Sequence, residues 1–258
     1  MEQIALIGGS GFYNFFQNQE TSNVTVDTPF GSVLFTEGVV DQTKVLFLPR
    51  HGTGHSVPPH MINYRANIFA LHKVDAKYVL ATNAVGSMQE HIQPGSFVVF
   101  DQFIDLVSGP ITFFEGDFEV VVDDKVKKGV VHTDVTYPYS QLLREHMVKT
   151  FEQHPSEVCH PKGCYVMNLG PRFETAAEIK LYRSMGGDVA GMTGSPEVIL
   201  CKELGIEYSS VGVVTNMAAG LQHEVTHQEV VELFDEKIAF VQELMRQTIS
   251  SLSKELTK

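Results

Sequence analysis

Short apolar runs recur along this chain, and they restrict the folds it can adopt more than any other feature. They lack the polar alternation of a strand with one wet face, so they are typical of strands buried on both faces of a sheet. Helical patterns lie between several of them, which favours a sheet covered by helices. The runs are Ile4–Ile7, Val45–Leu48, Tyr78–Ala81, Phe97–Phe100, Tyr165–Met167, Val189–Ala190 and Val211–Val214.

Helical signals mark the segments between these runs. Apolar residues recur at spacings of three or four in His60–Lys73, and Glu174–Met185 leads to a glycine pair. Ser195, read as an N-cap followed by Pro196, opens a helix that Gly205 closes. The carboxyl-terminal segment has one apolar stripe, which is typical of an amphipathic helix docked on a core. Its members are Val230, Phe234, Ile238, Val241, Met245, Ile249 and Leu252.

The segment Val24–Leu48 differs from the rest of the chain. Alternation around Thr28-Pro29-Phe30-Gly31-Ser32 and near Val39–Gln42 indicates antiparallel hairpins. We find no repeat, low-complexity segment or Pro/Ser-rich linker. The sequence therefore predicts one α/β domain over residues 1–258, with a central, mixed and twisted sheet flanked by helices on both faces. In such sheets ligands bind at the carboxyl ends of the strands.

Composition argues against several classes of function. The formal net charge of −12 opposes non-specific binding to nucleic acid, which needs a basic face. No apolar run reaches the roughly 18 to 20 residues that a membrane-spanning helix needs, and the start Met1-Glu2-Gln3 lacks the basic region of a signal peptide. Cys159, Cys164 and Cys201 have no paired spacing, so they fit a reducing compartment and form no zinc or redox motif. We expect a cytoplasmic protein without nucleic-acid or membrane partners.

A single amide side chain follows the apolar run Val211–Val214. It is Asn216, in Thr215-Asn216-Met217-Ala218-Ala219-Gly220, where small residues let a ligand come close. An amide is both donor and acceptor, so Asn216 can grip the N7 and O6 edge of a 6-oxopurine. Glu174 can accept from a purine N1–H, and Phe173 can stack on the base. The structural alternatives are a core Phe173 and a Glu174 that is merely the first-turn acid of its helix.

Two other strand ends carry patterns typical of anion-binding loops. Ser10 adds a hydroxyl to the glycine turn Ile7-Gly8-Gly9-Ser10-Gly11, although a plain strand-to-loop turn has the same pattern. Arg50 offers a planar fork for phosphate or carboxylate oxygens, and His51 beside it can donate a further hydrogen bond. The alternative is an exposed loop with a surface arginine. An acidic protein that binds an anion must place some of its few cations at the binding site. We therefore expect Arg50 to lie at such a site, which the structure can test.

Small polar residues at further strand ends complete the candidates. Asn83 and Ala84 lie in a stretch that permits close approach of a ligand, or in an ordinary buried strand end. Thr193 can donate to an anion near the positive N-terminus of the following helix. Met192 can pack against a sugar, or belong to the core. The remaining polar candidates, which surface or capping positions would also explain, are His132 and His227.

Together these motifs resemble the nucleoside phosphorylase family, in particular the trimeric branch of methylthioadenosine phosphorylases and their 6-oxopurine relatives. The resemblance implies that Met192 lies against the ribose, Phe173 against the base, and His132 at the 5′ end of the substrate in the neighbouring subunit. It also implies a homotrimer, or a dimer of trimers, with no metal and no cofactor besides inorganic phosphate as co-substrate. The phosphate ligands would be Ser10, Arg50, His51, Asn83, Ala84 and Thr193.

The chain departs from the adenine-handling members of this family. Those members place two Asp residues where this chain has Asn216 and Ala218, so the carboxylate that accepts from a 6-amino group is missing. Glu174 stands where the adenine-specific branch has Ser. Both changes point to a 6-oxopurine base.

The 5′ group of the substrate is less clear from the resemblance. Thr226-His227-Gln228-Glu229-Val230 resembles a segment that binds a 5′-hydroxyl, whereas Arg50–Tyr64 resembles the methylthio branch. The imidazole of His227 favours the hydroxyl. We expect a pentosyltransferase of purine salvage that phosphorolyses inosine and guanosine, with Asn216 and Glu174 as catalytic residues. The alternatives are a methylthioinosine or methylthioadenosine phosphorylase, a nucleosidase that uses water, and a non-catalytic nucleoside-binding module.

Overall fold

A computed structural model describes residues 3–257 apart from 10, 17–18, 108 and 110. The strands are β1 (Gln3–Gly8), β2 (Ser22–Thr28), β3 (Gly31–Val40), β4 (Thr43–Pro49), β5 (Ala76–Ser87), β6 (Phe97–Val99), β7 (Gln102–Asp105), β8 (Glu119–Val122), β9 (Lys125–Lys128), β10 (Cys159–His160), β11 (Cys164–Met167), β12 (Val189–Gly191) and β13 (Glu207–Met217). The helices are α1 (Tyr64–Lys73), α2 (Gln141–Glu152), α3 (Ala176–Ser184), α4 (Gly194–Glu203) and α5 (His227–Leu256), with a short 3-10 helix, η1, over Pro59–Met61.

One mixed sheet organises the fold. Its main path runs in the order β10-β6-β13-β5-β1-β4-β3-β2, and β5 is parallel to both β1 and β13. The carboxyl end of β5 also pairs, in antiparallel fashion, with β12, which leads on through β11 to β7. The long strand β5 therefore joins the two parts of the sheet, and the ends of several strands converge beside it.

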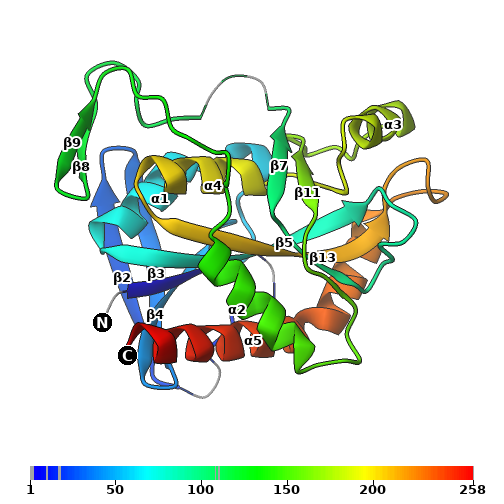
Figure 1. The fold of residues 1–258 in the computed structure, drawn as a ribbon, viewed down its shortest axis with the longest axis horizontal. Coiled ribbons are helices and arrows are strands. Elements are labelled where there is room, and N and C mark those ends of the chain that lie inside the picture. Colours follow the sequence, from blue (N-terminus) through cyan, green and yellow to red (C-terminus); the bar gives the residue numbers. More distant parts are fainter. Residues whose placement is uncertain (1–2, 10, 17–18, 108, 110, 258) are drawn as a thin grey trace.

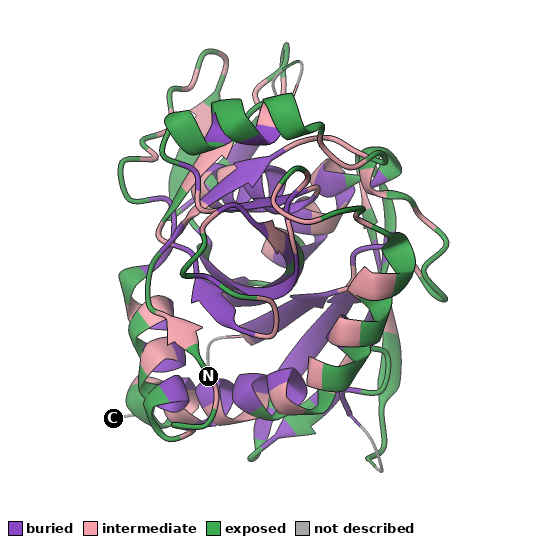
Figure 2. Ribbon diagram, turned by 90° about the vertical axis from the view of Figure 1, so that its right-hand side faces the viewer, coloured by how far each residue is buried: buried purple, intermediate pink, exposed green. Residues whose placement is uncertain are grey.

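Helices cover both faces of this sheet. In Figure 1, α1 and α4 lie above β5 and β13, while α2 and α5 lie below them. One apolar cluster includes Ile68 of α1 and Val198 of α4, and another includes Leu143 of α2 and Met245 of α5. Figure 2 shows the strands largely buried and the outer faces of the helices exposed. The predicted α/β architecture, a mixed sheet between helices, is confirmed.

The antiparallel hairpins predicted over Val24–Leu48 are present. β2 pairs with β3, and β3 pairs with β4, both in antiparallel register. Asp41 and Gln42, in the second turn, both have positive φ, the left-handed conformation that tight hairpin turns require. The apolar stripe of the last helix is also confirmed, because Phe234, Val241 and other members are buried on α5.

Two helix starts differ from the sequence prediction. The segment His60–Lys73 is not one helix, because the Asn63 side chain caps the amide of Ala66 and α1 begins only at Tyr64. Met61, predicted on the apolar stripe, is instead 64% exposed. The helix assigned to start at Ser195 begins at Gly194 with Thr193 as its N-cap residue.

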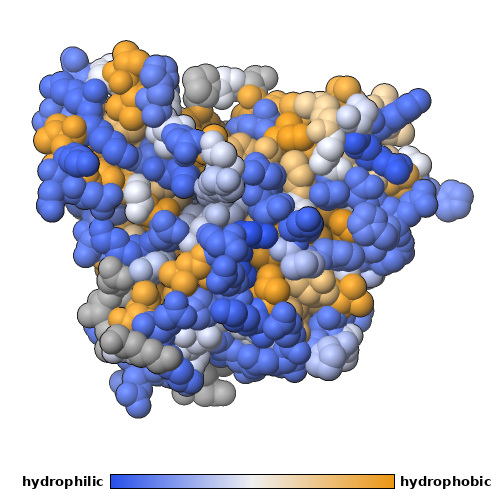
Figure 3. All heavy atoms as spheres, in the orientation of Figure 1, coloured by the Kyte–Doolittle hydropathy of each residue, from blue (hydrophilic) through white to orange (hydrophobic). Residues whose placement is uncertain are grey.

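The face drawn in Figure 3 is mainly hydrophilic, with hydrophobic atoms in scattered patches, one of them at the upper left. That region is where Figure 1 places the β8–β9 hairpin, whose Val121 and Val126 are exposed. None of the described helices is both long and apolar enough to cross a membrane.

Candidate active site

The carboxyl ends of the parallel strands β1, β4, β5 and β13 meet at one edge of the sheet. Residues at these ends line a cavity of about 370 Å³, a size that suits a small molecule. Because β12 runs antiparallel to β5, Met192 and Thr193, which follow β12, lie beside β5 and also line the cavity. The predicted site residues that line the cavity are Arg50, His51, Asn83, Ala84, Phe173, Glu174, Met192, Thr193, Asn216 and His227.

Of the other three predicted residues, the structure describes two, and neither is part of this lining. Ser10 lies outside the described residues. Ala218 is buried and packs in an apolar cluster with Val166 and Ala190, so its methyl group does not reach the cavity surface. His132 is exposed in the segment between β9 and α2 and does not line the cavity of its own chain.

Arg50 lines the cavity and forms a buried ion pair with Glu197. Its Nε lies 2.6 Å from Glu197 Oε1 and its Nη2 lies 2.8 Å from Glu197 Oε2, while Nη1 donates to the carbonyl of Thr82 at 2.6 Å. Burial alone would lower the pKa of Arg50, but the Glu197 carboxylate raises it, so the guanidinium stays charged. Three of its five N–H groups are used in these bonds, which leaves two for a ligand.

His51 presents a lone pair to the cavity in its neutral form. Its Nδ1 lies 2.9 Å from the carbonyl oxygen of Val57, which can only accept, so Nδ1 carries the proton. Burial and the neighbouring Arg50 charge lower the pKa of His51 to about 4. At neutral pH Nε2 is therefore an acceptor rather than the donor expected from sequence. It faces the glycine loop, since a Cβ at Gly9 would lie 4.0 Å from it.

A chain of buried polar side chains crosses the floor of the cavity. Ser210 Oγ donates to Asn83 Oδ1 at 2.6 Å, and Asn83 Nδ2 donates to Thr193 Oγ1 at 2.9 Å. The three residues come from β13, β5 and the start of α4, so the sheet topology brings them together.

Two amides at the N-terminus of α4 are already paired within the protein. The Tyr165 hydroxyl accepts from the amides of both Thr193 and Gly194 at 3.0 Å. These amides are the donors that would have met an anion at the helix N-terminus. The Thr193 hydroxyl is therefore the group of that residue left to contact a ligand, and the role predicted for Thr193 stays a prediction.

Asn216 is held by its own neighbours at the end of β13. Its Oδ1 accepts from Thr215 Oγ1 at 2.9 Å, and one Nδ2–H donates to the carbonyl of Met217 at 2.9 Å. A second N–H remains on Nδ2. Gly86 leaves room for this amide, because a Cβ there would lie 3.0 Å from Nδ2.

Glu174 lines the same cavity from the loop before α3. Thr175 caps that helix and forms a reciprocal capping box with Glu178, so Glu174 is not needed as the first-turn acid. Burial raises the pKa of Glu174. Phe173 and Met192 line the same cavity, and Met192 packs on Gly170, where a Cβ would meet its sulfur at 2.5 Å.

The cavity mouth combines imidazole and apolar groups. The rings of His51 and His55 lie 4.4 Å apart between centroids, and His227 is the first residue of α5. Burial, and then the proximity of His227, lowers the pKa of His55. The apolar residues of α5 at this mouth are Val230, Val231 and Phe234.

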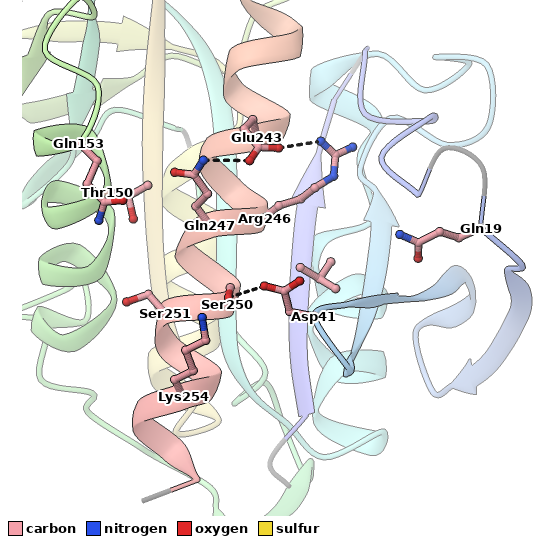
Figure 4. A pocket seen from close by; sticks show the side chains of 11 residues that line it. Gln19, Asp41, Thr150, Gln153, Glu243, Arg246, Gln247, Ser250, Ser251 and Lys254 are labelled. Atoms are coloured by element: carbon pink, nitrogen blue, oxygen red, sulfur yellow. Dashed lines mark hydrogen bonds and ion pairs between the residues drawn. The ribbon is translucent and has the colours of Figure 1, made fainter.

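A second cavity, of about 520 Å³, lies between α5, α2 and the β3–β4 turn (Figure 4). Several of its polar side chains pair with one another. Ser250 donates to Asp41 at 2.6 Å, and Gln247 donates to Glu243 at 2.8 Å. None of the predicted site residues that the structure describes lines this cavity, although it is the larger of the two.

The sequence analysis did not identify the residues that hydrogen-bond to the site residues and hold them in place. The sequence analysis assigns no role to Glu197, although a carboxylate in the buried stretch of α4 needs a cation partner. Tyr165 begins an apolar run and Ser210 directly precedes another, and no local pattern distinguishes either residue. Among the described residues, no three His, Cys, Asp or Glu side chains are grouped to hold a metal ion.

A family model described as the phosphorylase superfamily matches residues 3–250 of this chain. The chain belongs to the phosphorylase superfamily. It is 47% identical over 257 residues to a 6-oxopurine nucleoside phosphorylase of Pyrococcus furiosus, covering 99% of this chain and 95% of that one. It is 38% identical over 258 residues to an S-methyl-5′-thioadenosine phosphorylase of the same organism, covering 99% and 95%.

Solved structures of the superfamily share the fold. The methylthioadenosine phosphorylase of Schistosoma mansoni in complex with adenine superposes with a TM-score of 0.87 at 33% identity, covering 98% of this chain and 93% of that one. Since members of this superfamily at such similarity are phosphorylases, the chain is an enzyme of the pentosyltransferase class.

Proposed function

We propose that this enzyme catalyses the reversible phosphorolysis of 6-oxopurine nucleosides to free base and ribose 1-phosphate. The observation that carries the proposal is that Glu174 and Asn216 line one cavity together with Arg50, Asn83 and Thr193. A base-binding pair and an anion-binding group are thus adjacent, as attack by phosphate on a nucleoside requires. Relatives named 6-oxopurine nucleoside phosphorylase, at 40 to 47% identity, support this choice of base.

The base side of the reaction follows from what the two polar residues can donate and accept. As the bond between C1′ and N9 breaks, its electron pair moves into the purine ring. The free N–H of Asn216 donates to N7, where negative charge grows, and Glu174 accepts from N1–H. Adenine has no N1–H, and with Ala218 buried nearby no second carboxylate takes up its 6-amino group.

The phosphate side uses hydrogen bonds rather than net charge. Hydrogen phosphate carries one P–O–H, which can donate to Nε2 of neutral His51, while its charged oxygens accept from Arg50 and Thr193. A charged oxygen attacks C1′ as the oxocarbenium ion forms, and the phosphate proton ends on the released purine. We propose that phosphate is the co-substrate and that no metal or cofactor takes part. Dialysis against EDTA is then expected to leave the rate unchanged.

A second candidate substrate is S-methyl-5′-thioinosine. The apolar side chains of Val230, Val231 and Phe234 at the mouth favour a methylthio group at the 5′ position. His227 at the same mouth favours a 5′-hydroxyl, which can exchange hydrogen bonds with the imidazole. We favour the hydroxyl, because the exposed imidazole of His227 bonds to water in the free enzyme, and only a polar 5′ group replaces those hydrogen bonds when the substrate covers it.

The test is a substrate panel with and without phosphate. Inosine, guanosine, methylthioinosine, adenosine and methylthioadenosine are each assayed for release of base. We expect release from the 6-oxopurine nucleosides that depends on phosphate. Release that ignores phosphate would indicate a nucleosidase, the absence of release a binding module, and a preference for adenine nucleosides would contradict the assigned roles of Glu174 and Asn216.

We propose that the enzyme assembles as a homotrimer, or as a dimer of such trimers. The segment that carries His132 supports assembly, because Val130 is 87% and Tyr137 is 80% exposed in the single chain. Burying them against a neighbour would place His132 at the same interface. Light scattering measures the mass, and a monomer at micromolar concentration would contradict the proposal. We also propose that the enzyme is located in the cytoplasm, because its three free cysteines fit a reducing compartment.

A further inference from the structure

The polar chain that crosses the cavity floor has one closed end and one open end. Ser210 at the closed end is 1% exposed, and Asn83 in the middle is 3% exposed. Thr193 at the other end lines the cavity. Ser210 Oγ lies 2.6 Å from Asn83 Oδ1, and Asn83 Nδ2 lies 2.9 Å from Thr193 Oγ1.

The closed end sets the direction of the hydrogen bonds. A serine hydroxyl has one proton, and a buried proton without an acceptor is costly. Among the described residues, the acceptor that the Ser210 hydroxyl reaches is Asn83 Oδ1. With Oδ1 held by this bond, the amide must present Nδ2 to Thr193, so the Thr193 oxygen accepts and its own proton is free.

The opposite direction is less favourable. If the Asn83 amide turned over, Nδ2 would donate to Ser210, and the Ser210 proton would be left in the core. The Thr193 proton would then point inward to the amide oxygen, away from the cavity. Ser210 therefore decides whether the cavity floor offers a donor or a lone pair to an anion.

We propose that Ser210 is a positioning residue for the anion subsite, which orients Asn83 and Thr193 as donors without itself touching the ligand. This role rests on the phosphorolysis proposed above, in which that anion is phosphate. Two donors depend on it: the Thr193 hydroxyl and the second N–H of Asn83. Loss of Ser210 would weaken phosphate binding and leave the distant base-binding residues Glu174 and Asn216 as they are.

The test is Ser210→Ala, with Ser209→Ala as a matched control. Ser209 is the preceding residue of β13, equally buried, and its hydroxyl has no hydrogen-bond partner among the described residues. For Ser210→Ala we expect the KM for phosphate to rise about ten-fold, equal to about 1.4 kcal/mol, with the KM for inosine changed less than about two-fold. Ser209→Ala should change neither constant.

A double-mutant cycle separates positioning from a general structural effect. In a Thr193→Val background there is no hydroxyl left to orient, so Ser210→Ala should raise the KM for phosphate by a clearly smaller factor than in the wild type. An equal factor in both backgrounds, an equal rise in both KM values, or the same loss in Ser209→Ala would overturn the proposal. If Ser210→Ala does not fold, Ser210→Cys, a weaker donor, carries the same test.

The outcome also distinguishes this role from the function on which it rests. A wild type that phosphorolyses inosine, with an unchanged phosphate KM in Ser210→Ala, would overturn the positioning role alone. A wild type that cleaves no nucleoside would overturn the proposed function. The positioning role of Ser210 is then tested by the effect of inorganic phosphate on the melting temperature. Phosphate should raise it in the wild type and raise it less in Ser210→Ala. An equal rise in both proteins, or none in the wild type, would overturn the positioning role as well.

Discussion

Arg50 and Glu197 form a bidentate ion pair in which both side chains are 2% exposed, although 147 positions separate them in the chain. The pair has no net charge, and the neighbouring His51 is neutral at pH 7. The cation that the sequence led us to expect at the anion site is therefore present but neutralised. An anion is recognised there through directed N–H and O–H groups, so the direction of each hydrogen bond matters more than the sum of charges.

Replacing Glu197 by Gln should strongly destabilise the protein. The change leaves the Arg50 charge buried without a counter-charge and weakens the bond from the Tyr208 hydroxyl, which lies 2.7 Å from Glu197 Oε2. Removing one partner of a buried pair typically costs about 3–5 kcal/mol. Urea unfolding measures the loss. The control is Glu178→Gln, which breaks the exposed pair with Arg172 yet keeps an N3 residue that can cap α3. Similar losses in both variants would contradict the importance of burial.

His51 should make stability depend on pH. Its pKa is about 4 in the folded protein against an ordinary value of 6.5, so the unfolded chain binds the proton more readily. Its contribution is complete above about pH 6.5 and is lost as the pH falls towards 4. We expect the melting temperature to fall more between pH 7 and pH 5 in the wild type than in His51→Asn, whose amide can still donate to Val57 and cannot take up a proton. Equal falls would show that His51 is not the group responsible.

Gly86→Ala should impair the base site alone. A methyl group there would lie 3.0 Å from Asn216 Nδ2, closer than side chains normally pack, so the amide must shift by a few tenths of an ångström. We expect kcat/KM for inosine to fall about ten-fold, equal to about 1.4 kcal/mol of transition-state binding. The KM for phosphate, measured at saturating inosine, should stay within about two-fold. A rise in the phosphate KM of the same size would show that the shift spreads through the cavity.

His227→Leu should separate the two candidate substrates. If the imidazole binds a 5′-hydroxyl, kcat/KM for inosine should fall about ten-fold to a hundred-fold, or about 1.4–2.7 kcal/mol. Methylthioinosine should be spared or improved, because its apolar 5′ end gains a hydrophobic neighbour worth about 1 kcal/mol. Gln228→Leu, at the next and exposed position of α5, is the control. A wild type that strongly prefers methylthioinosine, with a variant indifferent between the two, would contradict the preference for inosine.

Several structural features could be predicted because they depend on neighbours in the chain. The hairpins over Val24–Leu48 follow from alternation and turn residues, and the buried face of α5 follows from the spacing of its apolar residues. The break before α1 was missed, since the cap formed by Asn63 competes with an apolar spacing that looks continuous. The unassigned helix α2 has Thr150 and His146 among its buried residues, which obscures its apolar stripe.

An amide, a carboxylate, an arginine and small polar residues could be placed at strand ends from the sequence, because strand ends are marked by local patterns. What each group can do for a ligand depends on the packed structure. Glu197 neutralises Arg50, Tyr165 takes the first amides of α4, and Ser210 orients Asn83. These partners come from distant segments, and the antiparallel return of β12 and the shared strand β5 bring them into contact. The direction of a hydrogen bond depends on which end of it is buried, and burial is a property of the packed fold.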